Sequence, residues 1–340
     1  MSSNTPSLSR PPVLVVTCQL PALAQQRLEA LTDVEVRQHG SLQSMPRAAL
    51  LGALADADGL ICVLSDRIDA EAVQAFGPRL RVVSTVSVGY DHVDVAAVQR
   101  RGVRIGNTPG VLTDATADTT VLLALMAARR AKQALALAEG GGGGFVLAGE
   151  LGSQFTGKAL GIIGLGRIGC ATAARLLPFG IARVVYAGSR AHAERATPLG
   201  AEYVTLPELL RVADIVCICC PLTEQTAGLI GRGALASMKP SAILVNTARG
   251  AIVCHDALLE ALDAGRIAHA ALDVTDPEPL PVEHPLLRHP RCTVLPHIGS
   301  ATEETRSAMA NLAIDNALAG IQGRPMVAEV GEPGPKASAD

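Results

Sequence analysis

The sequence predicts an α/β protein with two doubly wound, parallel-sheet domains that are joined by long connector helices. Short apolar runs alternate with segments of helical period along almost the whole chain. A long helical segment interrupts this alternation, which then restarts, so we expect two domains. The length of 340 residues agrees with this, because a domain usually holds about 100–200 residues.

The expected strands are continuous apolar runs, which are typical of parallel sheets that helices cover on both faces. The first series of runs comprises residues 13–17, 59–64 and 80–86. Segments of helical period lie between these runs, at residues 21–31, 46–55 and 69–76. The second series of runs comprises residues 159–164, 182–188, 214–219, 242–246, 268–274 and 292–296.

Two long helices are expected besides these series. One runs from about residue 114 to 137, where Thr113 or Asp114 is suited to cap its first turn and five glycines at 140–144 end it. We expect this helix to connect the two domains. The other spans residues 302–322, and its return to the first domain would make that domain discontinuous.

The composition limits the classes of protein to which this chain can belong. Hydrophobic residues make up 49% of the chain and charged residues 18%, which predicts a globular protein with an ample core. With a net charge of −3 and a pI of about 6.2, the chain is not expected to bind nucleic acid or a membrane surface. It has no apolar run of ~20 residues that could cross a membrane, and residues 1–12 lack the apolar region of a secretory signal.

Eight cysteines in a chain of this length are too few for a disulfide scaffold. Cys217, Cys219 and Cys220 lie at the end of an apolar run, and we interpret them as small core residues. The paired C-x-x-C spacing of a zinc site is missing, so we expect no metal. A reducing, intracellular compartment follows, and the cytoplasm is the expected one.

Residues 164–169 have the pattern G-x-G-x-x-G, directly after an expected strand and at the start of an expected helix. In that context the pattern predicts the dinucleotide-binding loop of a Rossmann fold. Gly164 permits a tight turn, Gly166 lets the backbone approach the pyrophosphate, and Gly169 lets helix and strand pack closely. The unpaired amides at the helix N-terminus would then receive the phosphates.

The residues after the next strand indicate which nicotinamide cofactor this loop binds. An NAD-specific site places Asp or Glu about 20 residues further on, where it binds the ribose 2′-hydroxyl. Here Tyr186 is followed by Ala-Gly-Ser-Arg, so Ser189 and Arg190 could bind a 2′-phosphate that a carboxylate would repel. We therefore expect NADPH to be preferred, with NADH as a second possible cofactor. The alternative is that Arg190 is a solvated loop residue in an enzyme that is indifferent to the cofactor.

Three segments follow strands of the second series, at the end of the sheet where doubly wound folds bind ligands. They are residues 245–253, 272–281 and 295–302. Together they supply Arg249, Glu278 and His297, a set that suits reduction of a 2-oxo acid. Arg249 can bind the carboxylate in a bidentate pair. His297 can protonate the carbonyl oxygen as hydride arrives, while Glu278 orients the imidazole and favours its charged form.

Several long motifs resemble those of the D-isomer-specific 2-hydroxyacid dehydrogenases and, within that family, the glyoxylate/hydroxypyruvate reductases of the animal type. The resemblance extends from about residue 12 to 328 and rests on LICVLSDRID, VVSTVSVGYDHVD, NTPGVLTDATAD, LGIIGLGRIG, LPFG, VNTARG, LDVTDPEPLPVEHPLL and VLPHIGSAT. It implies an oxidoreductase that reduces hydroxypyruvate to D-glycerate and glyoxylate to glycolate.

The resemblance also implies roles for individual residues. Arg249, Glu278 and His297 occupy the positions of the family's catalytic arginine, glutamate and histidine. The family's other binding positions are occupied by Val88 and Gly89 for the substrate carboxylate, Gly166, Arg167 and Ile168 for the pyrophosphate, Ser189 and Arg190 for the 2′-phosphate, and Pro221, Thr247 and Asp273 for the nicotinamide and ribose.

The family's substrate-binding domain is formed by both termini, so we expect it to comprise residues 1–110 and 303–330. Residues 111–302 would form the nucleotide-binding domain and residues 331–340 a disordered tail. Dimeric relatives imply a homodimer, with contacts from residues 121–126 and from the segment after the glycine run. In the glycine run and directly after it, Gly142 and Phe145 stand where the family usually has tryptophans, a departure that bears on substrate preference.

Two alternatives stay open. The chain could be another D-2-hydroxyacid dehydrogenase, acting on D-lactate, D-3-phosphoglycerate or a larger 2-oxo acid. For a phosphorylated substrate, however, only Arg67 and His92 offer positive charge near residues 88–90. The chain could also be a cofactor-sensing binding protein like the C-terminal-binding corepressors, which share the fold and the catalytic set. The lack of a recognisable peptide-binding addition argues against that alternative.

Overall fold

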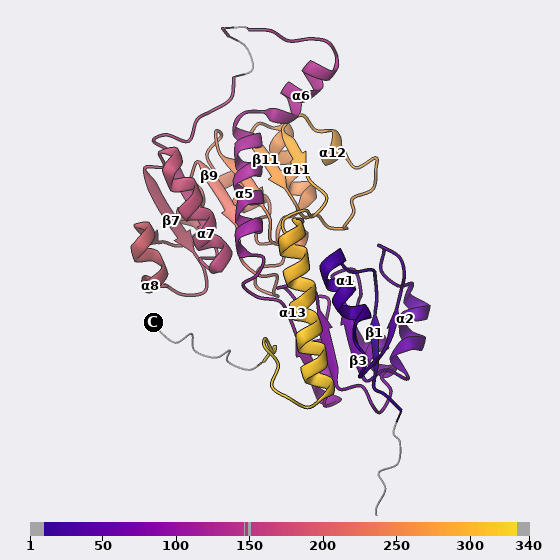
Figure 1. The fold of residues 1–340 in the computed structure, drawn as a ribbon. Helices are drawn as coiled ribbons and strands as arrows, with labels where there is room; N and C mark the ends of the chain where they lie inside the picture. The colour runs from indigo at the N-terminus through magenta and orange to yellow at the C-terminus, as the bar shows by residue number, and fades with distance from the viewer. Residues whose placement is uncertain (1–9, 146, 149–150, 332–340) are drawn as a thin grey trace, which may run out of the picture. The chain divides into compact units, whose positions relative to one another are not determined.

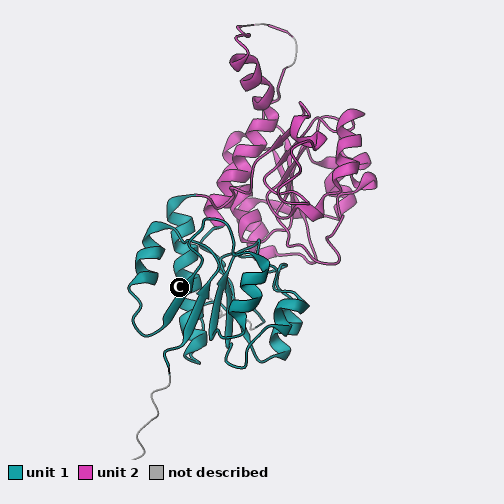
Figure 2. Cartoon of the chain, turned by 90° about the vertical axis from the view of Figure 1, so that its right-hand side faces the viewer, with its two compact units in different colours: residues 1–112, 302–340 teal, residues 113–301 magenta. Residues whose placement is uncertain are grey.

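The computed structural model describes residues 10–145, 147–148 and 151–331, and the chain folds into two compact units (Figure 1). Unit 1 comprises residues 1–112 and 302–340, and unit 2 comprises residues 113–301 (Figure 2). From residue 332 onward, the tail that we expect to be disordered lies outside the described residues. In the described part of the chain, no helix has the length and apolar character needed to cross a membrane.

Unit 1 is built around a five-stranded parallel sheet in the order β2-β1-β3-β4-β5. Its three central strands are wholly buried, as strands are when helices cover both faces of a sheet. The strands are β1 (Val13–Val16), β2 (Glu35–Gln38), β3 (Gly59–Cys62), β4 (Val82–Thr85) and β5 (Arg104–Gly106). The helices are α1 (Ala22–Glu29), α2 (Arg47–Leu54), α3 (Ala70–Gln74), α4 (Val95–Arg100) and α13 (Glu303–Ile321).

The C-terminal helix α13 completes unit 1. Thr302 caps the helix, because its side chain accepts a hydrogen bond from the Thr305 N–H. Near the other end, a Cβ on Gly320 would fall 2.5 Å from Cβ of Val82 in the sheet. Glycine therefore lets the helix lie directly on β4, and segments from both ends of the chain form one unit.

Unit 2 contains a seven-stranded parallel sheet in the order β12-β11-β10-β9-β6-β7-β8. β6 lies between β7 and β9, so the strand order reverses there, at the place where doubly wound sheets bind dinucleotides. The strands are β6 (Ala159–Ile163), β7 (Arg183–Ala187), β8 (Ala201–Tyr203), β9 (Ile215–Ile218), β10 (Ile243–Asn246), β11 (His269–Leu272) and β12 (Cys292–Val294). The helices are α5 (Thr113–Ala128), α6 (Ala131–Glu139), α7 (Arg167–Leu176), α8 (Ala193–Ala196), α9 (Leu206–Val212), α10 (Arg232–Ser237), α11 (His255–Asp263) and α12 (Pro285–Arg288).

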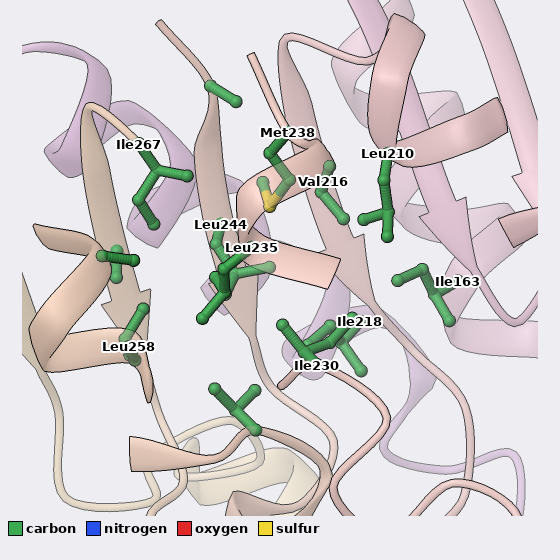
Figure 3. Packing of buried hydrophobic residues seen from close by; sticks show 14 of the residues in the cluster. Ile163, Leu210, Val216, Ile218, Ile230, Leu235, Met238, Leu244, Leu258 and Ile267 are labelled. Carbon is green, nitrogen blue, oxygen red and sulfur yellow. The ribbon is translucent and has the colours of Figure 1, made fainter. Parts of the chain in front are cut away.

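Aliphatic side chains fill the core of unit 2 on both faces of its sheet. On one face, Val216 of β9 and Leu244 of β10 pack in one cluster with Leu235 of α10 and with Met238, the residue that follows this helix (Figure 3). A second cluster joins the intervening residues of the same strands to α5 and α7, because side chains alternate across a strand. The sheet is therefore covered on both faces, as its continuous apolar strands predict.

The prediction of one helix over residues 114–137 is wrong, because two helices, α5 and α6, occupy this segment. They are separated at Arg130, whose φ of +51° lies in the left-handed region. The carbonyl of Ala128, at the end of α5, accepts a hydrogen bond from the Ser153 N–H (2.8 Å). A contact made by a later segment therefore competes with helix continuation, and neither glycine nor proline marks the break in the sequence.

Candidate active site

The three candidate catalytic side chains follow three neighbouring strands of unit 2. Because β10, β11 and β12 are adjacent and parallel, their carboxyl ends meet at one edge of the sheet. Arg249, Glu278 and His297 lie in the loops immediately beyond these ends. The buried strands thus bring together three polar loops that are far apart in the sequence.

Glu278 and His297 form a hydrogen-bonded pair. The Nδ1 atom of His297 lies 2.5 Å from Oε1 of Glu278. Because an ionised carboxylate only accepts hydrogen bonds, Nδ1 is the donor in this pair, and Nε2 is the ring nitrogen that does not contact Glu278. The side chain of His297 is 25% exposed and that of Glu278 is 41% exposed, so small solutes can reach the pair.

The surroundings of Glu278 favour its ionised form. Burial opposes ionisation, but hydrogen bonds from His297 and the Thr275 N–H, and the positive charges of His297 and Arg249, outweigh it. Together they hold the pKa of Glu278 below its usual range. A carboxylate that stays charged at neutral pH stabilises a protonated imidazole beside it, so the pair is suited to hold a proton on His297 and deliver it through Nε2.

An anchored turn fixes the backbone of His297. Its φ of +54° lies in the left-handed region, which residues other than glycine rarely adopt. The buried Asp273 carboxylate accepts the N–H groups of Ile298 and Gly299, each at 2.8 Å. The Asp273 carbonyl accepts the His297 N–H, also at 2.8 Å. These hydrogen bonds hold His297 in a conformation that a free loop would seldom populate.

The loop of Arg249 is held by Asn246, the last residue of β10. The fully buried Asn246 side chain donates from Nδ2 to the Arg249 carbonyl (2.8 Å) and accepts the Ala248 N–H (3.0 Å). Arg249 is half-buried as a residue, and its guanidinium donates to the Ala248 carbonyl (2.8 Å). A planar guanidinium on such a supported loop is suited to give two parallel hydrogen bonds to a carboxylate.

Each glycine of the G-x-G-x-x-G loop meets a different local requirement. Gly164 has a φ of +95°, and a Cβ there would lie 2.8 Å from main-chain atoms of Cys220. At Gly169, in the first turn of α7, a Cβ would lie 2.3 Å from the Gly164 carbonyl oxygen. At Gly166, the N-cap of α7, no atom of the described residues lies within 4 Å of that position. The loop is tightly packed at its ends and leaves room at Gly166 for a phosphate group beside unpaired helix amides.

Two tyrosines order the loop after β7. The Tyr186 hydroxyl oxygen accepts the His192 N–H (2.9 Å), and the Tyr203 hydroxyl donates to a carbonyl of the same loop (3.1 Å). Ser189 and Arg190 are exposed between these anchors. The loop therefore presents a hydroxyl and a guanidinium, and its sequence contains no carboxylate, where a Rossmann fold meets the ribose 2′ group. These features fit a phosphorylated dinucleotide.

The other expected cofactor residues are Pro221, Thr247 and Asp273, which follow β9, β10 and β11. The Pro221 carbonyl accepts a hydrogen bond from the Thr226 hydroxyl (2.7 Å), and the hydroxyls of Thr247 and Thr120 lie 2.8 Å apart. Asp273 is buried, and its carboxylate anchors the turn described above. Among the described residues, no group of His, Cys, Asp and Glu side chains is arranged to hold a metal ion.

Val88 and Gly89, the expected carboxylate-binding residues, belong to unit 1 and follow β4. Their carbonyls are engaged, because Asn107 Nδ2 donates to that of Val88 (2.9 Å) and the Ser87 hydroxyl donates to that of Gly89 (2.6 Å). Within the described ranges, the N–H groups of Val88 and Gly89 donate to no protein acceptor. This loop of unit 1 therefore offers two main-chain donors for an anionic ligand.

The sequence alone indicates no role for Asn246 or Thr275, and it does not show that Asp273 anchors the His297 turn. Asn246 does carry a signal, because it is a polar residue at the end of an otherwise apolar strand. Thr275 carries none, since its contacts depend on how the following loop folds.

Comparisons with known proteins find a family profile and full-length relatives that this chain resembles. The family profile described as D-isomer specific 2-hydroxyacid dehydrogenase, NAD binding domain, matches residues 121–299. A glyoxylate reductase/hydroxypyruvate reductase of Homo sapiens is 44% identical over 316 residues, covering 93% of this chain and 96% of that protein. A glyoxylate reductase of Aeropyrum pernix is 43% identical over 322 residues, covering 93% of this chain and 95% of that protein.

Solved structures share the fold over nearly the full length. The TT0316 protein from Thermus thermophilus is 45% identical, with a TM-score of 0.86, and the match covers 94% of this chain and 99% of that one. An NADPH-dependent glyoxylate/hydroxypyruvate reductase from Sinorhizobium meliloti, solved in complex with NADP and malonate, is 31% identical with a TM-score of 0.82. That match covers 95% of this chain and 97% of the other.

Proposed function

The chain belongs to the D-isomer-specific 2-hydroxyacid dehydrogenases, and on that premise we propose that it reduces hydroxypyruvate to D-glycerate and glyoxylate to glycolate with NADPH. It is an oxidoreductase of that family with a nicotinamide dinucleotide as its cofactor. The observation that carries the proposal is the His297–Glu278 pair. The pair lies beyond β12 and β11, and β11 is the neighbour of β10, the strand that precedes Arg249. The names of the relatives support the choice of substrates.

His297 is the general acid in this proposal. When bound, the nicotinamide supplies a hydride to the carbonyl carbon of the substrate. His297 donates the proton on Nε2 to the carbonyl oxygen, so that no full negative charge has to develop there. Glu278 remains ionised throughout, orients the ring through Nδ1 and stabilises the imidazolium before the transfer. Because His297 is 25% exposed, it can take a new proton from solvent after each turnover.

Arg249 binds the substrate carboxylate. Its guanidinium provides two donors in a plane, which match the two oxygens of a carboxylate. The N–H groups of Val88 and Gly89 are further carboxylate donors in this proposal. These groups recognise the 2-oxo acid portion that all candidate substrates share, so they select the class of substrate rather than its side chain.

The cofactor is held by the glycine loop and by the loop after β7. Gly166 and the first amides of α7, those of Arg167 and Ile168, bind the pyrophosphate. Ser189 and Arg190 bind the 2′-phosphate, which NADH lacks, and this difference favours NADPH. The residues that border the nicotinamide and its ribose are Pro221, Thr247 and Asp273.

Steady-state kinetics test the proposal. The kcat/KM values for hydroxypyruvate, glyoxylate and pyruvate are compared, each with NADPH and with NADH below saturation. We expect hydroxypyruvate and glyoxylate to exceed pyruvate, and NADPH to exceed NADH. A preference for pyruvate would instead indicate a D-lactate dehydrogenase. Binding of NADPH without turnover of any 2-oxo acid would indicate a cofactor-sensing binding protein.

We also propose that the enzyme is a homodimer in the cytoplasm. α6 buries none of its nine residues, and together with residues 140–145 it extends away from the sheet of unit 2 (Figure 1). Leu135 and Leu137 are 56% and 57% exposed, and Phe145 is 93% exposed. A second copy of the chain would cover these apolar side chains. The reducing cytoplasm suits the free thiols, most of which are buried.

A further inference from the structure

The loop that carries Glu278 touches the loop that carries Arg249 through main-chain atoms. A Cβ on Gly250 would lie 2.0 Å from the carbonyl carbon of Thr275, 2.1 Å from its oxygen and 2.6 Å from the nitrogen of Asp276. No side-chain rotation could relieve such an overlap, because all three atoms belong to the main chain. The residue directly after Arg249 is therefore packed against the main chain at the start of the Glu278 loop.

Thr275 is also bonded to the Glu278 loop at two points. Its N–H donates to Oε2 of Glu278 (3.3 Å), and its hydroxyl donates to the Pro277 carbonyl (2.9 Å). The residue is buried, with 8% of its surface exposed. The Glu278 carboxylate is thus held by both oxygens, with Oε1 on His297 and Oε2 on Thr275.

We infer that Thr275 is a positioning residue for the reduction. Thr275 directs the Glu278 carboxylate toward His297, and its main-chain contact with Gly250 holds that carboxylate in a fixed position relative to Arg249. The inference rests on the proposed roles of Glu278 and His297. Thr275 does not act on the substrate itself. Its hydroxyl fixes the carbonyl of the residue before Glu278, so without that bond the carboxylate is free to turn away from Nδ1.

Removal of the hydroxyl gives the first test. Thr275→Val keeps the branched shape, and we expect kcat to fall about 2- to 10-fold, the factor that corresponds to one neutral hydrogen bond. The basic limb of the pH–rate profile should move to lower pH, because a misaligned Glu278 stabilises the imidazolium less. Thr275→Ser keeps a hydroxyl and should restore the wild-type limb. Thr156→Val is the matched control, because that hydroxyl donates to the Phe179 carbonyl away from both loops.

Separation of the two loops gives a second, independent test. The Cβ of Gly250→Ala overlaps the main chain of Thr275, so the loops must move apart. We expect KM for hydroxypyruvate to rise and the basic limb to move in the same direction as in Thr275→Val, while the NADPH dissociation constant is unchanged. Gly233→Ala in α10 is the control, since no atom of the described residues lies within 4 Å of that Cβ position.

A double variant shows whether Thr275 acts through Glu278. If it does, adding Thr275→Val to Glu278→Gln changes neither kcat nor the basic limb any further. The inference is overturned if the profile of Thr275→Val matches that of the wild type, or if the two changes are additive. Should Thr275→Val not fold, the Gly250→Ala comparison decides in the same way. Near-normal kcat in His297→Ala would instead overturn the proposed function, so the two failures are distinguishable.

Discussion

The guanidinium of Arg249 is expected to be irreplaceable by another cation. A lysine ammonium is a point charge and cannot reproduce the planar pair of donors that matches a carboxylate. Arg249→Lys should therefore raise KM for hydroxypyruvate about tenfold or more, the effect of losing one charge-assisted hydrogen bond, and leave the NADPH dissociation constant unchanged. Separate measurement of the two constants checks this. An unchanged KM for hydroxypyruvate would remove Arg249 from its proposed role.

Cofactor choice depends on two exposed residues after β7. In a variant with both Ser189→Asp and Arg190→Ala, a carboxylate replaces the hydroxyl and the neighbouring cation is lost. The ratio of kcat/KM with NADPH to that with NADH should shrink or reverse, because like charges repel the 2′-phosphate. The measurement uses each cofactor below saturation. A wild-type enzyme that is equally fast with NADH would contradict the claim before any variant is made.

The sequence reveals the residues that carry the chemistry more readily than the residues that support them. Arg249, Glu278 and His297 can be singled out because each is a reactive side chain directly after an apolar strand. The hydrogen bond between His297 and Glu278, by contrast, joins residues of separate loops. The support from Asn246 and Thr275 also arises only once those loops are folded.

At the scale of elements, strands buried on both faces are predicted best. The nine apolar runs correspond to β1, β3, β4, β6, β7, β9, β10, β11 and β12. The unpredicted strands β2, β5 and β8 read EVRQ, RIG and AEY, and each lies at the edge of its sheet. An edge strand has only one neighbouring strand and is less covered, so its sequence needs no continuous apolar run.

The first residue of β11 makes the stability of the fold depend on pH. Burial, aided by the positive charges of Arg130 and Arg291, lowers the pKa of His269 to about 4. As the pH falls, the unfolded chain binds a proton at this histidine near pH 6.5, whereas the folded chain binds it only near pH 4. Stability is therefore full above pH 6.5 and declines as the pH falls to 4, by about 3 kcal/mol from this residue.

Replacement of that histidine isolates its effect. Urea unfolding is measured at pH 7.5 and pH 5 for the wild type and for His269→Leu. Between these two pH values the wild type should lose about 2 kcal/mol more than the variant, because the variant has no proton to bind at this position. His39→Leu, in unit 1, should behave like the wild type. Equal losses in the wild type and His269→Leu would show that His269 does not carry the dependence.

At the scale of the whole molecule, the exposed apolar side chains of α6 are expected to hold two copies together. Light scattering at micromolar concentration should give twice the mass of the 35.0-kDa chain. The double variant Leu135→Glu and Leu137→Glu should give the mass of one chain, because burying two carboxylates in an apolar contact is unfavourable. Leu23→Glu changes a leucine of unit 1 that is similarly exposed, at 59%, and should remain dimeric. A monomeric wild type would refute the proposal.

In the proposed reduction, His297 supplies the proton and the Glu278 carboxylate stabilises the protonated imidazole. His297→Ala removes the proton donor and should lower kcat about 10²- to 10⁴-fold, the usual contribution of a positioned acid. Glu278→Gln keeps the shape and a hydrogen-bonding group but removes the charge that stabilises the imidazolium. NADPH affinity should survive both changes, because neither residue belongs to the glycine loop.

The pH–rate profile of hydroxypyruvate reduction, recorded for the wild type, His297→Ala and Glu278→Gln, is the most direct test of this mechanism. NADPH affinity is measured separately, so that a loss of rate is not mistaken for a loss of cofactor. We expect the basic limb in Glu278→Gln to lie at lower pH than in the wild type, and we expect His297→Ala to lose most of its kcat. An unshifted basic limb in Glu278→Gln, or near-normal kcat in His297→Ala, would contradict this mechanism.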